Sequence, residues 1–375
     1  MYTLSRIDME SEIRMARNFD IAVFEGDGIG PEIMAPTIAV LRSLADRSDA
    51  YDLSFASLPA GAAHYAKTGD SLPAASLDAA GKADAILLSA MGLPDVRYAD
   101  GTEISPQIDL RKAFNLFAGV RPVRIGPGHK TPLKIPEGRE VDFVLIREST
   151  EGLFYTQGTG EVTAEDARET LRITRDTSEK LFRFAFSLAQ DRKAHGQGKG
   201  RVTCVDKANV FRAFAFFRGI FDEEAKAFPN LVADHAYVDA TALWMVQKPW
   251  DFDVLVTENM FGDILSDLGA GLMGGLGVAP SADIGLEQAV FQPCHGSAPD
   301  IAGQGKANPM AMILSAAMML EWLGIRHDIA PLTTDGQRLR QAVEQVMEEG
   351  TVVTADLGGQ ASTQETGQAV MAALA

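Results

Sequence analysis

The stretch FDVLVTENMFGDILSDLGAGLMGGLG, residues 252–277, decides the fold class of this chain. Residues 254–257 form an apolar, β-branched run that is typical of a strand, and a turn is expected at 258–261. A short helix is predicted from Gly262, followed by a glycine-rich exit. A strand that leads into a helix is the repeating unit of α/β proteins, so this stretch predicts that class.

The same alternation extends over the rest of the chain. Further strand-like runs lie at 21–24, 85–88, 141–146, 202–205 and 231–233. Apolar residues recur with helical spacing at 32–44, 76–82, 165–192, 210–227, 241–248 and 310–323. Strands that alternate with helices indicate a mainly parallel sheet. The length of 375 residues, at roughly 150 per domain, indicates two to three domains.

Charge and cysteine content narrow the classes of function. Lys and Arg total 34 against 51 for Asp and Glu, which gives a formal net charge of −17. This balance argues against a nucleic acid or an acidic membrane as partner, because both require a basic surface. Cys204 and Cys294 form no disulfide framework and residues 1–18 hold no apolar leader, so a cytoplasmic location is expected. The apolar run 310–323 is too short for a membrane span and predicts a buried helix.

Two carboxylates one helical turn apart are the first candidate site. Asp263 and Asp267 stand at i and i+4, so both project from one face of the predicted helix. A bound cation would remove their mutual repulsion, and oxygen ligands favour Mg²⁺ or Mn²⁺ over zinc. The alternative is a pair of solvated surface aspartates. A third carboxylate, Asp239, follows another predicted strand.

Three arginines form the second candidate site. Arg147 follows an apolar strand directly, which is where ligands bind in open α/β sheets. Arg111 and Arg121 lie in DLRKAF and in the extended segment GVRPVR. Arginine binds carboxylates in a bidentate manner, so the three together suit a di- or tricarboxylate. Ordinary surface arginines are the alternative interpretation.

A lysine and a glycine-rich loop complete the set. Lys207 also leaves an apolar strand, and partial burial there would suit a general base, whereas the alternative is a solvent-directed lysine. The loop CHGSAPDIAGQGKANP (294–309) allows close backbone approach to a phosphate or nucleotide. The segment GDGIG (26–30) lacks the G-x-G-x-x-G spacing because Pro31 follows, so a Rossmann fingerprint is not predicted.

Taken together, eight ordered segments resemble the β-decarboxylating dehydrogenase family, which includes 3-isopropylmalate, isocitrate, D-malate and tartrate dehydrogenases. They are GDGIGPE (26–32), LRKAFNLFAGVRPV (110–123), RESTEG (147–152), VDKANV (205–210), YVDA (237–240), FGDILSD (261–267), HGSAPDIAGQGKANP (295–309) and TADLGG (354–359). The sequences of these segments resemble those of 3-isopropylmalate dehydrogenases most closely. The resemblance implies an isopropylmalate dehydrogenase-like α/β fold of two domains, not a Rossmann fold. It places an N-terminal tail at 1–18, a cofactor-side domain at 19–117 plus 274–375, and a second domain with the dimer interface at 118–273.

The resemblance also implies a role for each candidate residue. Arg111, Arg121 and Arg147 match the arginines that hold the substrate carboxylates. Asp263 and Asp267 match metal ligands of one subunit. Asp239 matches the third metal ligand and Lys207 the catalytic lysine, and both are delivered by the partner. The implied enzyme is therefore a homodimer with a shared active site, dependent on NAD and on Mg²⁺ or Mn²⁺. The matches to the cofactor-binding loop are His295, Gly296, Ala298, Asp300, Ile301 and Asn308. Asp300 favours NAD, because its carboxylate would repel a 2′-phosphate.

Several positions depart from the family pattern. Phe154 stands where the family has a proton-donating Tyr, and the adjacent Tyr155 is the other candidate donor. We expect Phe154 to pack near the substrate and Tyr155 to point away, because adjacent residues of an extended segment face opposite sides. Gln292 replaces a usual Glu, and its loss of charge is expected to weaken a cofactor contact.

The stretch before Arg111 bears on substrate choice. Ser105 and Gln107 make this part of the pocket more polar than an isopropyl group requires. The predicted reaction is oxidative decarboxylation of a malate-type 2-hydroxy diacid, with 3-isopropylmalate leading and isocitrate, D-malate and tartrate left open. A non-catalytic regulatory homologue is the alternative from another class.

Overall fold

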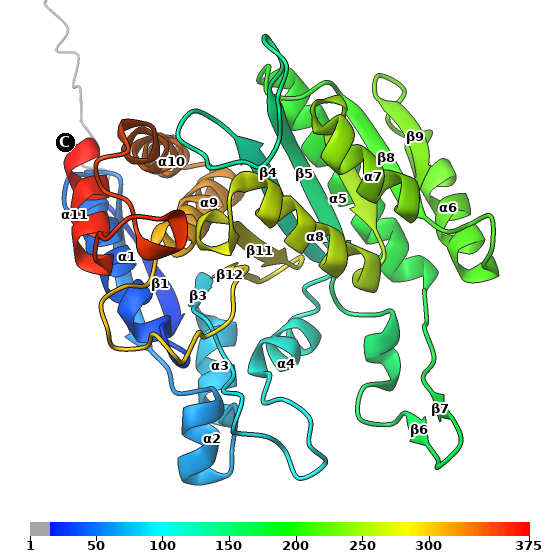
Figure 1. The fold of residues 1–375 in the computed structure, drawn as a ribbon, viewed down its shortest axis with the longest axis horizontal. Coiled ribbons are helices and arrows are strands. Elements are labelled where there is room, and N and C mark those ends of the chain that lie inside the picture. The colour runs from blue at the N-terminus through cyan, green and yellow to red at the C-terminus, as the bar shows by residue number, and fades with distance from the viewer. Residues whose placement is uncertain (1–15) are drawn as a thin grey trace, which may run out of the picture.

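A computed structural model describes residues 16–375, and its centre is a ten-stranded sheet. The strands of this sheet are β1 (Arg17–Phe24), β2 (Tyr51–Ser57), β3 (Ala85–Leu88), β4 (Ala118–Ile125), β5 (Val141–Glu148), β8 (Arg201–Asp206), β9 (Val232–Tyr237), β10 (Val254–Thr257), β11 (Pro280–Ile284) and β12 (Ala289–Pro293). Their spatial order is β2-β1-β3-β12-β11-β4-β5-β10-β8-β9. The small hairpin β6 (Glu161–Val162) and β7 (Ala167–Arg168) extends away from the body of the molecule (Figure 1).

Helices cover both faces of this sheet (Figure 1). They are α1 (Gly30–Ala45), α2 (Ala62–Thr68), α3 (Ala74–Lys82), α4 (Pro106–Ala113), α5 (Arg175–Ala194), α6 (Arg212–Ala225), α7 (Val238–Gln247), α8 (Asn259–Met273), α9 (Met310–His327), α10 (Ala330–Glu349) and α11 (Thr363–Ala373). The buried helix predicted at 310–323 is confirmed as α9, in which Ile313, Leu320 and Leu323 are fully buried. No described helix is long and apolar enough to cross a membrane.

The α/β class is confirmed, and the sheet is mixed at its centre. Strands β2, β1, β3 and β12 run parallel on one side, and β5, β10, β8 and β9 run parallel on the other. Between them, β11 pairs antiparallel with both β12 and β4, and β4 pairs antiparallel with β5. The predicted domain boundaries at 117/118 and 273/274 fall at the start of β4 and the end of α8. Segments from both ends of the chain thus make one half of the sheet (Figure 1).

Three predicted boundaries are wrong. The expected turn at 258–261 is helical from Asn259 onward, because the Glu258 side chain accepts the backbone N–H groups of Met260 (3.1 Å) and Phe261 (3.3 Å) and so caps α8. The helix expected from 165 begins only at Arg175, after the β6–β7 hairpin. The predicted tail 1–18 is too long, because β1 begins at Arg17. Residues 1–15 of the predicted tail lie outside the described residues.

Candidate active site

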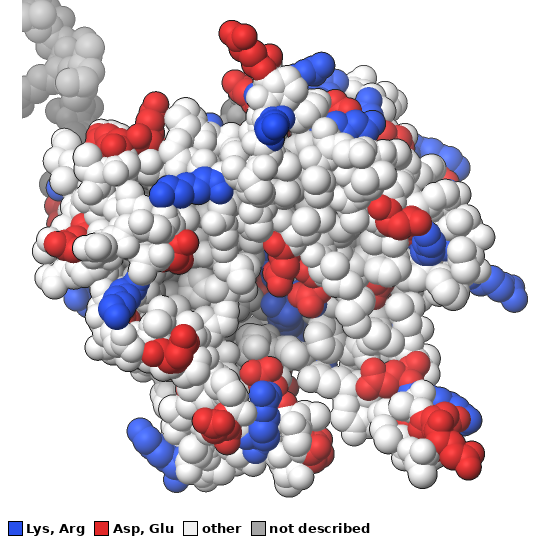
Figure 2. All heavy atoms as spheres, in the orientation of Figure 1, with Lys and Arg blue, Asp and Glu red and all other residues white. Residues whose placement is uncertain are grey.

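One cavity of about 350 Å³ lies between the two halves of the sheet. Helices α4 and α8, strands β4 and β5, and the loop after β12 all contribute to its wall. The predicted residues that line it are Gln107, Arg111, Arg121, Arg147, Phe154, Asp263, Asp267, Gln292, His295 and Gly296. Figure 2 shows a hollow near the centre of the view, in which acidic and basic side chains lie next to each other.

The three arginines are buried, so the surface alternative is wrong. Arg111, Arg121 and Arg147 are 8%, 5% and 6% exposed. A guanidinium stays charged when it is buried and therefore requires anionic partners. Burial, followed by the charge of Arg111, lowers the pKa of Arg147 to about 10, which still leaves it protonated at neutral pH. The cavity thus concentrates positive charge in a strongly acidic protein.

Asp283 of β11 anchors two of these arginines, and no local pattern predicted this residue. Its fully buried carboxylate accepts from Arg111 Nε (3.0 Å), Arg121 Nη2 (3.4 Å), Ser149 Oγ (3.2 Å) and Gln292 Nε2 (2.6 Å). Burial acts to raise the pKa of Asp283, but the three arginine charges outweigh it and lower the pKa to about 2. Gln292, the departure from the family pattern, therefore donates to a carboxylate that stands beside it.

Arg147 is held from the α8 side. Its Nε and Nη2 donate to Asn259 Oδ1 at 3.2 and 2.8 Å, and its Nη1 forms a close ion pair with Asp263. Gly262 permits this approach, because a Cβ at that position would lie only 2.6 Å from Arg147 Cγ. Helix α8 therefore positions an arginine and the two candidate metal ligands together.

Asp263 and Asp267 line the same cavity from one face of α8. Burial, followed by the charge of Asp263, raises the pKa of Asp267, which is the response of carboxylates that lack a cation. Two carboxylates beside a cavity fit a Mg²⁺ or Mn²⁺ ion in ligand type. Within residues 16–375, no three His, Cys, Asp or Glu side chains come close enough to hold a metal. One chain thus offers two of the three predicted ligands.

The third predicted ligand lies elsewhere on the same chain. Lys207, which follows β8, and Asp239, in the first turn of α7, are not among the residues that line this cavity. Lys207 Nζ and Asp239 Oδ2 form an ion pair at 2.7 Å. The hydrogen bond from Lys207 lowers the pKa of Asp239. The structure brings these two residues together, but away from the arginines.

The orientation predicted for Phe154 and Tyr155 is confirmed. Phe154 lines the cavity, whereas the Tyr155 side chain is 49% exposed and its ring lies 3.9 Å from the Arg172 guanidinium carbon. Both residues lie in a short 3₁₀ helix, Leu153–Thr156, where neighbouring side chains diverge. Among the Phe, Tyr and Trp residues of the described chain, only Phe154 lines the cavity, and its ring has no proton to give. Tyr155 does not line the cavity and is therefore given no role in the mechanism.

The predicted cofactor loop lies between β12 and α9. Burial lowers the pKa of His295, whose Nδ1 contacts the Gly296 carbonyl (2.9 Å) and whose buried Nε2 has no hydrogen-bond partner among the described residues. A buried acceptor of this kind fits the amino group of an adenine. Asn308 is also buried and is held by Asp356 (3.1 Å).

The rest of the loop is held by the GDGIGPE segment. Glu32 accepts from the backbone N–H groups of Gly303 (3.0 Å) and Ala307 (3.1 Å), and Ile29 N–H donates to the Ser297 carbonyl (2.8 Å). Ala298 and Ile301 are half-buried, while Gly296 and Asp300 are exposed. The GDGIGPE segment thus holds the loop in place through these hydrogen bonds.

Of the two residues predicted to influence substrate choice, Gln107 lines the cavity and Ser105 does not. Gln107, on α4, lines the cavity, and its buried Oε1 has no hydrogen-bond partner among the described residues. Ser105 precedes α4 and donates to the Glu103 carbonyl (3.3 Å) instead of lining the cavity. Cys294 is half-buried and also lines the cavity.

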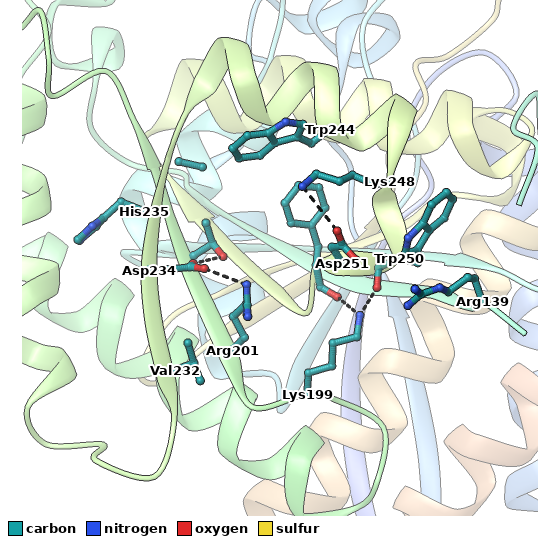
Figure 3. Close-up of a pocket in the computed structure, with 13 residues that line it drawn as sticks. Arg139, Lys199, Arg201, Val232, Asp234, His235, Trp244, Lys248, Trp250 and Asp251 are labelled. Carbon is teal, nitrogen blue, oxygen red and sulfur yellow. Dashed lines mark hydrogen bonds and ion pairs between the residues drawn. The ribbon is translucent and has the colours of Figure 1, made fainter. Parts of the chain in front are cut away.

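A second cavity, of about 500 Å³, lies at the opposite end of β8 and β9, where both strands begin (Figure 3). Two of the cations that line it have protein partners. Arg201 pairs with Asp234 (3.1 Å), and Lys199 donates to the Phe252 (3.0 Å) and Trp250 carbonyls. None of the predicted site residues lines this cavity.

Comparison with known proteins agrees with this arrangement. A family model described as isocitrate/isopropylmalate dehydrogenase matches residues 20–370. The 3-isopropylmalate dehydrogenase of Streptococcus thermophilus is 42% identical over 361 residues, which cover 94% of this chain and 99% of the relative. The 3-isopropylmalate/3-methylmalate dehydrogenase of Methanocaldococcus jannaschii is 40% identical over 351 residues and covers 93% and 97%. A crystal structure of isocitrate dehydrogenase from Methylococcus capsulatus aligns with a TM-score of 0.83 at 36% identity, over 95% of this chain and 99% of that chain.

The fold, the arginine cavity and these matches define the class as decarboxylating dehydrogenases. Within that class, the chain belongs to the isocitrate/isopropylmalate dehydrogenase family. The resemblance read from the eight sequence segments is thereby confirmed. The isopropylmalate dehydrogenase-like fold is confirmed with it.

Proposed function

We propose that this protein catalyses the NAD-dependent oxidative decarboxylation of a malate-type 2-hydroxy diacid with the help of Mg²⁺ or Mn²⁺. One observation carries the proposal: three buried arginines and two adjacent aspartates line a single cavity. The arginines suit two carboxylates, and the aspartates suit a divalent ion next to them. The loop 295–308, with the unpartnered Nε2 of His295, supports an adenosine-containing cofactor at the cavity rim.

The residues then divide the chemistry between them. Arg111, Arg121 and Arg147 orient the substrate carboxylates, and Lys207 of a second copy accepts the proton of the C2 hydroxyl, directly or through water. When bound, the cation would act as a Lewis acid toward the C2 oxygen, and NAD would accept the hydride from C2. The C3–carboxylate bond of the resulting β-keto acid then breaks, CO₂ leaves, and its electron pair enters an enolate. Since Phe154 cannot donate, water supplies the proton that C3 finally accepts.

We further propose a homodimer in which each cavity is completed by the partner. Leu243 and Val246 of α7, and Met260 and Ile264 of α8, are 53%, 50%, 41% and 63% exposed. These two helices contact each other and lie side by side (Figure 1), and α8 also carries Asp263 and Asp267. We take the exposed apolar side chains of the two helices as one apolar face. A second copy on this face would bury it and bring foreign residues next to Asp263. Such a copy accounts for the separation of Lys207 and Asp239 from the cavity of their own chain.

The first substrate to test is 3-isopropylmalate, because the relatives at about 40% identity carry that name. A second candidate class is favoured by Gln107. Gln107 lines the cavity, and its buried Oε1 has no partner among the described residues. A purely apolar substituent would leave this acceptor without a hydrogen bond, which costs binding free energy. A C3 hydroxyl, as in tartrate, would satisfy this acceptor, and D-malate would leave room for a bridging water.

The remaining alternative is a regulatory homologue that binds ligands without turnover. Phe154 supports it, whereas the complete set of arginines, aspartates and Lys207 supports an enzyme. Two free cysteines, Cys204 and Cys294, agree with a proposed cytoplasmic location.

The proposal is tested by an NADH-release screen with Mn²⁺ against 3-isopropylmalate, D-malate, tartrate and isocitrate. We expect NADH and CO₂ in equal amounts from at least one dicarboxylate, and loss of both when a chelator is added. Absence of NADH from all four, with tight binding of any of them, would favour the regulatory homologue instead.

A further inference from the structure

Asp283 has no role in the reaction proposed above, yet it is a buried carboxylate that binds two of the cavity arginines. It is fully buried behind the arginines and does not itself line the cavity. Its oxygens accept hydrogen bonds from two guanidinium groups, one amide and one hydroxyl. A buried carboxylate with these partners is a permanent negative charge, because protonation would break charge-assisted bonds.

Asp283 occupies some of the N–H groups that the arginines could otherwise donate to a ligand. Arg121 donates Nη1 to the Val120 (3.2 Å) and Ala282 (3.1 Å) carbonyls and Nη2 to Asp283, so three of its four terminal N–H groups already have protein partners. Arg111 uses only Nε on Asp283 and keeps both terminal nitrogens for a ligand. Asp283 therefore fixes the direction of Arg111 and reduces the share of Arg121 in ligand binding.

The same carboxylate sets the charge that a ligand meets. Three guanidinium charges and one buried carboxylate leave two positive charges for the substrate. In the resting protein, in which Lys207 and Asp239 form an ion pair, the other charged groups of the proposed site cancel, since Asp263 and Asp267 would balance a divalent cation. Two positive charges match a dicarboxylate, whereas a third substrate carboxylate would stay uncompensated in a desolvated cavity.

We infer that Asp283 restricts this enzyme to substrates with two carboxylates and disfavours tricarboxylates such as isocitrate. This inference rests on the function proposed above and narrows its substrate class. Asp283 acts through Arg111 and Arg121, so it is a specificity-determining positioning residue and not a catalytic one. Gln292 supports it by donating to Oδ2 at 2.6 Å.

Asp283→Asn tests the inference, because it removes the charge and keeps the shape. Calorimetry with Mn²⁺ present would compare the binding of D-malate and isocitrate, and steady-state kinetics would compare their kcat and KM. We expect the ratio of isocitrate to D-malate affinity to rise about tenfold or more, since one additional substrate charge loses its repulsion. The change should appear in KM more than in kcat. An unchanged ratio, or a parent protein that already prefers isocitrate, would overturn the inference.

Two further variants separate charge from local contacts. Asp283→Asn combined with Gln292→Glu moves the carboxylate to the neighbouring side chain and should restore the parental ratio; failure to restore it in a folded protein would refute the role of charge. Asp253→Asn is the matched control, because Asp253 is equally buried and binds Arg192 (2.9 Å) away from the cavity. It should leave the ratio unchanged. A shifted binding ratio without NADH formation would support the inference and contradict the proposed function.

Discussion

Buried charges hold one another in place at the scale of single residues. Arg111 and Arg121 share Asp283, while Arg147 is held by Asn259 and Asp263. Each guanidinium is therefore oriented before a ligand arrives, which lowers the entropic cost of binding. The same pre-organisation explains why the arginines could be buried at all.

Phe154→Tyr is expected to raise kcat for the best substrate without changing the affinity for NAD. The new hydroxyl would supply a proton donor at the cavity, and loss of a general acid typically costs about 10²–10⁴-fold in the step that it serves. Because that step need not limit turnover, the measured gain will be smaller. Tyr155→Phe serves as control and should have no effect. A Phe154→Tyr variant slower than the parent would show that the phenyl ring is required for shape.

Asp300→Lys with Ile301→Tyr is expected to shift cofactor preference from NAD toward NADP. Asp300 is exposed in the proposed cofactor loop, where its carboxylate would accept hydrogen bonds from ribose hydroxyls and would repel a 2′-phosphate. The measurement is kcat/KM for both cofactors in parent and variant. Equal use of NADP by the parent would contradict the assignment of Asp300.

The ion pairs of Asp283 predict a pH dependence of stability. Its folded pKa of about 2 lies below the unfolded value of about 3.9, so it contributes stability that is present above that unfolded value and is lost as the pH falls toward 2. Urea unfolding of the parent and Asp283→Asn should therefore differ by a constant free energy above pH 5. The difference should shrink between pH 4 and pH 3. A difference that stays constant over that range would exclude Asp283 as its source.

The sequence analysis identified the three arginines as candidate site residues but did not identify Asp283. Arg147 ends an apolar strand, a local signal that points to a ligand edge. Asp283 lies inside the short strand PSADI, and only the antiparallel pairing of β11 with β4 brings it behind Arg121. Contacts between residues far apart in the chain leave no local pattern, so such partners were missed.

Helix α8 is the element that joins the proposed substrate site and the proposed metal site. It presents Asp263 and Asp267 on one side and Ile264 to solvent on another, and Gly262 lets it approach Arg147. A shift of this one helix would disturb the proposed ion and the substrate carboxylate together.

Asp267→Asn is expected to abolish metal-dependent activity and to leave the melting temperature of the metal-free protein equal or higher. Burial and Asp263 raise the pKa of Asp267, so its ionisation opposes folding as the pH rises past the unfolded value, and the amide removes that cost. Calorimetric melting with and without Mn²⁺ checks both parts. Retained stabilisation by Mn²⁺ in the variant would contradict the role of Asp267 as a ligand.

Local alternation predicted the class of the fold, but not the sheet order. Strands such as β3 and β10 were recognised because they are short apolar runs. Strands β4 and β11 were missed, since Pro122 interrupts one and polar residues interrupt the other. Their antiparallel pairing at the centre depends on tertiary contacts and could not be read from periodicity.

The whole molecule has its proposed reactive groups in two separate places. The arginines and α8 aspartates surround the cavity, while Lys207 and Asp239 pair outside it. The exposed apolar face of α7 and α8 and the projecting β6–β7 hairpin offer surfaces through which a second copy could close the gap. The central claim is therefore that one active site requires two chains.

Subunit complementation tests that claim most directly. Lys207→Ala and Asp263→Asn chains, each inactive alone, are mixed under conditions in which subunit exchange is shown by mass spectrometry, and NADH release is measured. We predict that activity returns in the mixture, because a heterodimer contains one cavity with an intact Asp263 and a partner that supplies Lys207. If exchange occurs and the mixture stays inactive, the two residues act within one chain and the shared site is contradicted.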